Sequence, residues 1–292
     1  MGMRTIIVLA VSCAILPACG GAASGSGLAV VAAENMYGDI AEQIGGAHVR
    51  VTSILSDPNA DPHLFEPGSS NGLAVAKARV VIQNGVGYDA FMTKLENASP
   101  SSKRSVLTIA DVLGIHGRDA NPHLWYDVPA LAKIAGAIAA QLVDADPGHA
   151  RAYRTGLAAF NASLTPLRRE VAHIRDSFGG SAVAYTEPVP GYLLDAAGLT
   201  NLAPTGFTRA IEEGTEPSPQ AVGAMDALMS EKRVKVLLYN SQAVSPITSA
   251  VRAAAEHAGI PVIGVTETLP PKLTFQQWQL GQARELAAAL IR

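Results

Sequence analysis

Short β-branched segments alternate with helical patterns from Leu28 to the end of the chain, and this alternation limits the possible folds more than any other feature. Parallel strands must be joined by crossover segments, which are usually helices, so the alternation is typical of parallel α/β units. The expected strands fall into two groups, residues 28–33, 49–55, 79–85 and 105–110, and then residues 181–186, 234–240 and 261–266. The sequence therefore predicts an α/β fold of two lobes, each with a parallel sheet flanked by helices.

A long helical stretch separates the two groups of strands. An Asp-Pro pair at 146–147 supplies its N-cap and first helical residue, and a Gly-Gly pair at 179–180 ends it. An uninterrupted helix of this length would extend about 45 Å, but Pro166 should kink or split it. The expected units are a first lobe of residues 28–145, a single long linking helix of residues 146–180 and a second lobe of residues 181–292.

Residues 1–19 have the features of a lipoprotein signal peptide. Arg4 precedes an apolar run over residues 5–16, and the sequence LPAC at 16–19 resembles a lipobox. The proline of that motif is unusual, so a plain signal peptide cleaved among residues 22–24 stays open as an alternative. Acylation of Cys19 would account for the one thiol that remains after processing, since that thiol has no partner for a disulfide.

Residues 20–27 form a Gly/Ala/Ser run that is expected to be a flexible tether. No later segment approaches the ~20 uninterrupted apolar residues that span a bilayer. We therefore expect an exported monomer, held by its lipid on the extracytoplasmic side of the cell membrane. The formal net charge is −3 and no basic stripe occurs, which argues against a nucleic-acid partner.

Two similar turns carry histidine: DPHLFEP at residues 61–67 and NPHLWYD at residues 121–127. Proline fixes its own φ and favours an extended conformation in the residue before it, so each turn holds its histidine in one direction. Neutral imidazole is the commonest protein ligand of metal ions, and a fixed direction reduces the entropy lost on binding. His63 and His123 are therefore predicted metal ligands.

The second lobe offers two glutamates at matching places. Glu187 and Glu267 each follow a threonine at the end of a predicted strand, where open α/β sheets bind ligands. Two carboxylates buried together repel each other, and a divalent cation removes this penalty. Glu187 and Glu267 are therefore the predicted partners of the two histidines.

In these motifs the chain resembles the metal-binding solute-binding proteins of bacterial ABC importers for manganese, zinc and iron. The resemblance runs from about Leu28 to the C-terminus. It implies two lobes bridged by a long helix, one divalent ion held by His63, His123, Glu187 and Glu267, and delivery of that ion to an ABC permease and its ATPase. The motifs that carry it are DPHLFEP, NPHLWYD, the TEP at 186–188, IEEGTEPSP at 211–219, LLYNSQ at 237–242 and VTETLP at 265–270.

The identity of the metal stays open between manganese and zinc, with iron also possible. Histidine and carboxylate ligands suit all three ions. A carboxylate that binds through both oxygens favours manganese slightly, whereas zinc binds more tightly on intrinsic affinity. The family commonly has Asp where this chain has Glu267, and its zinc members often have a third His where Glu187 stands.

Two other functions are alternatives to transport. An exported metallohydrolase needs an open coordination position and a general base, and the chain has no H-E-x-x-H or G-x-S-x-G motif, so no enzymatic activity is expected. A surface adhesin of the same fold stays open as an alternative. Among other residues near the motifs, Glu66 and Asp127 are expected to orient the two histidines, and Glu212 and Glu213 to close a loop or begin a helix.

Overall fold

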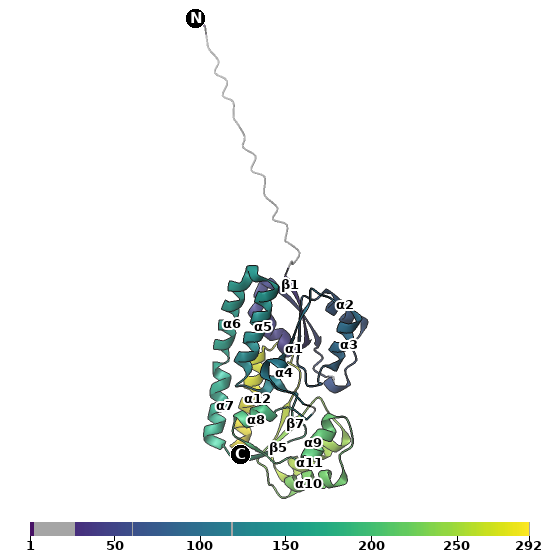
Figure 1. Ribbon diagram of the computed structural model, residues 1–292. Helices are drawn as coiled ribbons and strands as arrows, with labels where there is room; N and C mark the ends of the chain where they lie inside the picture. The colour runs from purple at the N-terminus through teal and green to yellow at the C-terminus, as the bar shows by residue number, and fades with distance from the viewer. Residues whose placement is uncertain (3–26, 60, 118, 292) are drawn as a thin grey trace.

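The computed structural model describes residues 1–2, 27–59, 61–117 and 119–291 (Figure 1). Nearly all of the predicted signal peptide, including Cys19, and nearly all of the tether lie outside the described residues. Within the described residues no helix has the length and apolar character needed to cross a membrane.

The first lobe contains a four-stranded parallel sheet in the order β2-β1-β3-β4. Its strands are β1 (Leu28–Glu34), β2 (Val49–Leu55), β3 (Val80–Gln83) and β4 (Ser105–Thr108). Side chains of β1 alternate between the two faces of the sheet: Val30 and Ala32 pack in one core cluster, and Val31 and Ala33 in another. Helices on both faces explain why this central strand is apolar at successive positions.

Five helices accompany the first sheet. They are α1 (Asn35–Gly45), α2 (Ser69–Lys77), α3 (Ala90–Ala98), α4 (Ile109–Leu113) and α5 (Leu131–Ala145). Helices α1 and α5 supply side chains to the cluster around Val30, and α2 and α3 supply side chains to the cluster around Val31. The two pairs therefore cover opposite faces, as Figure 1 shows.

The second lobe repeats this arrangement with the parallel order β6-β5-β7-β8. Its strands are β5 (Ala182–Tyr185), β6 (Thr200–Asn201), β7 (Leu237–Asn240) and β8 (Val262–Val265), and its helices are α8 (Gly191–Ala196), α9 (Thr205–Glu212), α10 (Pro219–Ser230), α11 (Pro246–Ala258) and α12 (Phe275–Leu290). The sequence did not predict β6, because a strand of two residues shows no periodicity.

The linking segment consists of two helices, α6 (Ala150–Ser163) and α7 (Thr165–Phe178), which run along one side of both lobes (Figure 1). The break falls at Leu164, and Pro166 lies in the first turn of α7, where its missing N–H is tolerated. This confirms the expected split. The predicted boundaries of the lobes and linker remain a prediction.

One core cluster continues through both lobes. It includes Val30 and Ile82 of the first sheet, Val183 and Leu238 of the second, and the inner side of α7. The C-terminal helix α12 packs on α7 and also contacts α1 of the first lobe. The two lobes therefore share packed apolar side chains as well as a linking segment.

Candidate metal centre

His63 is held by the first of the two turns. Pro62 begins a short 3-10 helix, Pro62–Leu64, and the Asp61 carboxylate accepts a hydrogen bond from the His63 backbone N–H at 2.9 Å. This local bond fixes the turn without using the imidazole. The side chain of His63 is 21% exposed, which leaves it the most accessible of the four predicted ligands.

His123 is held more tightly by the second turn. Asn121 Oδ1 accepts from the His123 backbone N–H at 3.0 Å and lies 2.7 Å from His123 Nδ1. Because Asn121 Nδ2 donates to the Pro188 carbonyl at 2.8 Å, its oxygen faces the imidazole, and the proton of the neutral ring is on Nδ1. His123 Nε2 is therefore free to donate its electron pair to a metal ion.

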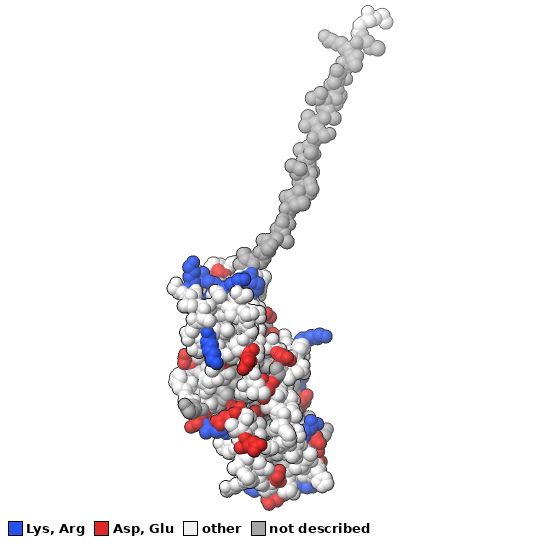
Figure 2. Space-filling view, turned by 90° about the vertical axis from the view of Figure 1, so that its right-hand side faces the viewer, with Lys and Arg blue, Asp and Glu red and all other residues white. Residues whose placement is uncertain are grey.

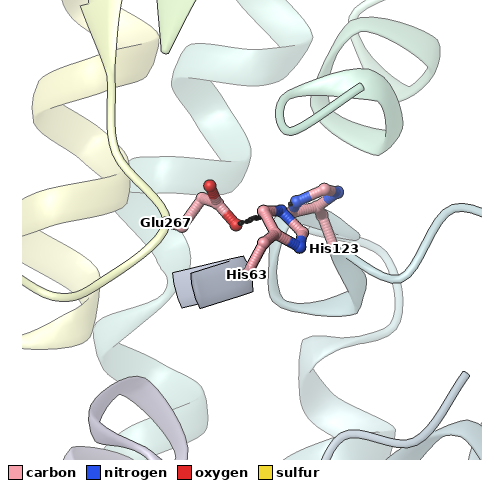
Figure 3. Close-up of side chains that lie close together, drawn as sticks. All are labelled: His63, His123 and Glu267. Carbon is pink, nitrogen blue, oxygen red and sulfur yellow. Dashed lines mark hydrogen bonds and ion pairs between the residues drawn. The ribbon is translucent and has the colours of Figure 1, made fainter. Parts of the chain in front are cut away.

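Glu267 meets both histidines from the second lobe (Figure 3). Its carboxylate is fully buried, and Oε2 lies 3.2 Å from His123 Nε2 and 3.4 Å from His63 Nε2. The three side chains each offer one ligand atom, and these atoms all lie within 4.8 Å of one another. The structure thus brings together three of the four predicted site residues in a group compatible with a metal ion.

Glu187 lies beside this group and is connected to it by Asn240. Asn240, the last residue of β7, donates through Nδ2 to Glu187 Oε2 and, at 2.8 Å, to Glu267 Oε1. The other oxygen of Glu187, Oε1, is buried without a hydrogen-bond partner among the described residues. A buried carboxylate oxygen of this kind normally has a partner, so it fits an atom meant for a cation.

The charges of these groups depend on one another. Burial by itself raises the pKa of Glu267, but contacts with His123 and His63 outweigh burial and hold that pKa well below its usual range. Burial by itself lowers the pKa of His63, but the hydrogen bond and charge of Glu267 raise it to about 9. Burial and the charge of Glu267 raise the pKa of Glu187 to about 8. A cation would compete with protons on His63 and Glu187.

Two side chains in the centre were not identified from the sequence. Tyr88 donates its hydroxyl to Glu267 Oε2 at 2.9 Å, and Asn240 joins the two carboxylates. Tyr88 lies two residues after Val86. The φ of Val86 is 54°, which is strained for a β-branched residue. Polar residues are common in Gly-rich turns and at strand ends, so no sequence pattern distinguished Tyr88 or Asn240 from other residues of this kind.

The expectation that Asp127 orients its histidine was wrong in detail. Its carboxylate accepts from the Ala130 backbone N–H at 3.2 Å, and Asn121 is the residue that holds the imidazole. Glu66 is exposed, and among the described residues it has no hydrogen bond or ion pair with His63. Glu212 was expected to close a loop or begin a helix, but it is the last residue of α9, and its Oε1 lies 3.9 Å from His123 Nδ1.

A cavity of about 930 Å³ opens beside His63 between the lobes. First-lobe residues that line it include Tyr88 and Asn121, and second-lobe residues include Tyr192 and Glu212. An ion pair between Asp119 and Arg209 joins the lobes at its wall. The centre is therefore reached from solvent on the side of His63.

The chain is similar to known proteins over most of its length. The family model of the periplasmic zinc-uptake complex component A, ZnuA, matches residues 30–289. The manganese-binding lipoprotein MntA of Bacillus subtilis (strain 168) is 26% identical over 243 residues, which cover 80% of this chain and 77% of that protein. All of these matches extend over both lobes.

Two solved structures show the same fold. A crystal structure of ZnuA has a TM-score of 0.72 at 23% identity and covers 91% of this chain and 97% of its own. A mutant of the laminin-binding adhesin Lmb from Streptococcus agalactiae has a TM-score of 0.76 at 22% identity, covering 90% and 100%. At these identities the likeness concerns the two-lobe fold alone.

Proposed function

This chain belongs to the ZnuA family of metal-binding components of ABC transporters, and from that premise we propose that it captures manganese or zinc between its lobes and delivers the ion to a membrane permease. The proposed ligands are His63, His123, Glu187 and Glu267. The observation that carries the proposal is the convergence of two imidazoles and one carboxylate within 4.8 Å, from three distant parts of the chain.

The partners follow from the family. An ABC permease and its ATPase would receive the ion, and acylated Cys19 would anchor a monomer on the extracytoplasmic side of the membrane. On the face drawn in Figure 2, Lys and Arg gather at the upper end of the body, and elsewhere they are scattered among acidic and uncharged residues.

Release of the ion would involve a small displacement of the lobes. The core cluster shared by the lobes and the two linking helices both oppose wide opening, because opening would expose apolar side chains to water. A permease that binds the ion-loaded pose would then recognise the relative position of the lobes that the bridging ion stabilises.

Uptake of isotopically labelled metal tests this function. Cells that lack the chain should take up less manganese or zinc at submicromolar supply, and the wild-type chain should restore uptake. The variant Glu267→Ala should not restore it, although it is exported in equal amount. Full restoration by Glu267→Ala would contradict transport through this centre.

A further inference from the structure

Asn240 occupies the position from which one side chain can reach both carboxylates. It ends β7, which lies between β5 and β8 in the second sheet, and these two strands lead to Glu187 and Glu267. Its Nδ2 donates to Glu187 Oε2 and to Glu267 Oε1. An amide nitrogen has two hydrogens, so both are used.

The orientation of this amide is fixed by its surroundings. Asn240 Oδ1 accepts from the Gln242 backbone N–H at 3.0 Å, and the Asn240 backbone N–H donates to Thr186 Oγ1 at 3.0 Å. A flipped amide would direct Oδ1 at two carboxylates and lose both bonds to them. Since Asn240 is 1% exposed, water cannot readily replace those bonds.

One oxygen of each carboxylate is directed away from Asn240. Glu187 Oε1 has no partner among the described residues, and Glu267 Oε2, which accepts from the Tyr88 hydroxyl, faces the Nε2 atoms of both histidines. Each carboxylate oxygen has two lone pairs, so a hydrogen bond does not by itself exclude a bond to an ion. Glu187 Oε2 and Glu267 Oε1 are directed at Asn240, however, so binding an ion through both oxygens would require each carboxylate to turn, and the bonds to Asn240 oppose that turn. Together with His63 and His123, the protein then offers two nitrogen and two oxygen donors.

We infer that Asn240 is a specificity-determining residue, which holds each glutamate with one oxygen turned away from the ion and so makes the centre favour zinc over manganese. Zinc accepts four nitrogen and oxygen donors in a tetrahedron, whereas manganese prefers more oxygen donors. The inference rests on the proposed function and names zinc as the transported ion. Binding through both carboxylate oxygens, which favoured manganese from the sequence, is opposed by this amide.

The test compares Asn240→Ala with Asn201→Ala by competitive titration of zinc and manganese in one buffer. Asn201 ends the strand β6 of the same sheet. Its Oδ1 accepts from the Ala203 backbone N–H at 3.1 Å, and Asn240 Oδ1 accepts in the same way from the backbone N–H of Gln242, also two residues later. The control therefore removes the turn bond alone. We expect the zinc-to-manganese affinity ratio to fall about tenfold or more in Asn240→Ala, as for loss of a residue that positions ligands, and to stay constant in Asn201→Ala.

A fall of both affinities by the same factor in Asn240→Ala would overturn the inference. X-ray absorption of zinc-loaded wild type gives a second test that needs no variant: four nitrogen and oxygen neighbours are expected, and five or six would also overturn it. Failure of the proposed function is distinct, because the wild type would then bind neither metal.

Discussion

Asn121 joins the two lobes through Pro188: its amide nitrogen donates to the Pro188 carbonyl at 2.8 Å, while its oxygen lies 2.7 Å from His123 Nδ1. One side chain therefore contacts a ligand of the first lobe and the residue after Glu187 of the second. The corresponding Asp61 accepts from the His63 backbone, and the described residues show no hydrogen bond from it to the second lobe.

Asn121→Ser should accelerate release of the ion. The new side chain adds no charge but loses the donor to Pro188, and one lost hydrogen bond corresponds to about a fivefold change. Stopped-flow chelation measures the dissociation rate. Asn201→Ser, at the end of β6 in the second lobe, is the control and should leave that rate unchanged. An equal acceleration in both variants would show that the bond between the lobes is not the cause.

His63→Ala and His123→Ala should each weaken zinc binding by more than about 100-fold, because loss of a ligand costs more than loss of a residue that orients one. Both variants should also lose most of the zinc-induced rise in melting temperature. His173→Ala, an exposed residue of α7, should do neither. Calorimetry and thermal unfolding measure the two effects, and similar losses in all three variants would indicate general destabilisation.

Binding of the ion should release about two protons near pH 7. Without an ion, the pKa of His63 is raised to about 9 and that of Glu187 to about 8, so both groups carry a proton at pH 7. The ion must displace these protons, and its apparent affinity should therefore rise with pH until about pH 9. Calorimetry in buffers of different ionisation enthalpy counts the protons, and Glu187→Gln should release one fewer. A pH-independent affinity would contradict the assignment.

Gly156→Ala should destabilise the fold by about 1–3 kcal/mol. A Cβ at Gly156 of α6 would lie 2.2 Å from the Ile44 carbonyl oxygen of α1, so the two helices would have to separate. Gly136→Ala in α5 is the control, because a Cβ there has no atom within 4 Å, and it should stabilise by up to about 1 kcal/mol. Denaturant unfolding of both variants tests the sign of each effect.

Cys19→Ser should move the mature protein from the membrane fraction to the soluble exported fraction, because the acyl chain supplies the proposed anchor. Zinc affinity should not change, since Cys19 lies far along the chain from the predicted ligands. Immunoblots of fractionated cells measure the distribution. An unchanged distribution would favour a plain signal peptide.

The sequence predicted the features that have a local cause. Strands β1 and β2 were placed by their β-branched runs, and the break before Pro166 by the chemistry of proline. His63 and His123 were identified because Asx-Pro turns have a short, recognisable pattern. The alternation of strands and helices predicted the two lobes, and the family model confirms the family resemblance.

The contacts between distant residues could not be predicted in the same way. Nothing in the sequence around Asn240 or Tyr88 indicates that each reaches Glu267, since these bonds depend on sheet order and on the packing of one lobe against the other. The structure also places Glu187 beside the three-residue group rather than in it. Its part in metal binding therefore remains a proposal.

The core cluster that passes through both sheets makes this chain indivisible. A lobe excised by itself would expose the apolar side chains of α7 or α12 that pack across the molecule. Exchanging one lobe for that of a relative would require every contact of this cluster to match at once. The two lobes have the same strand order, but neither is expected to fold without the other. Substitutions near the metal centre must therefore be compatible with an interior that both lobes share.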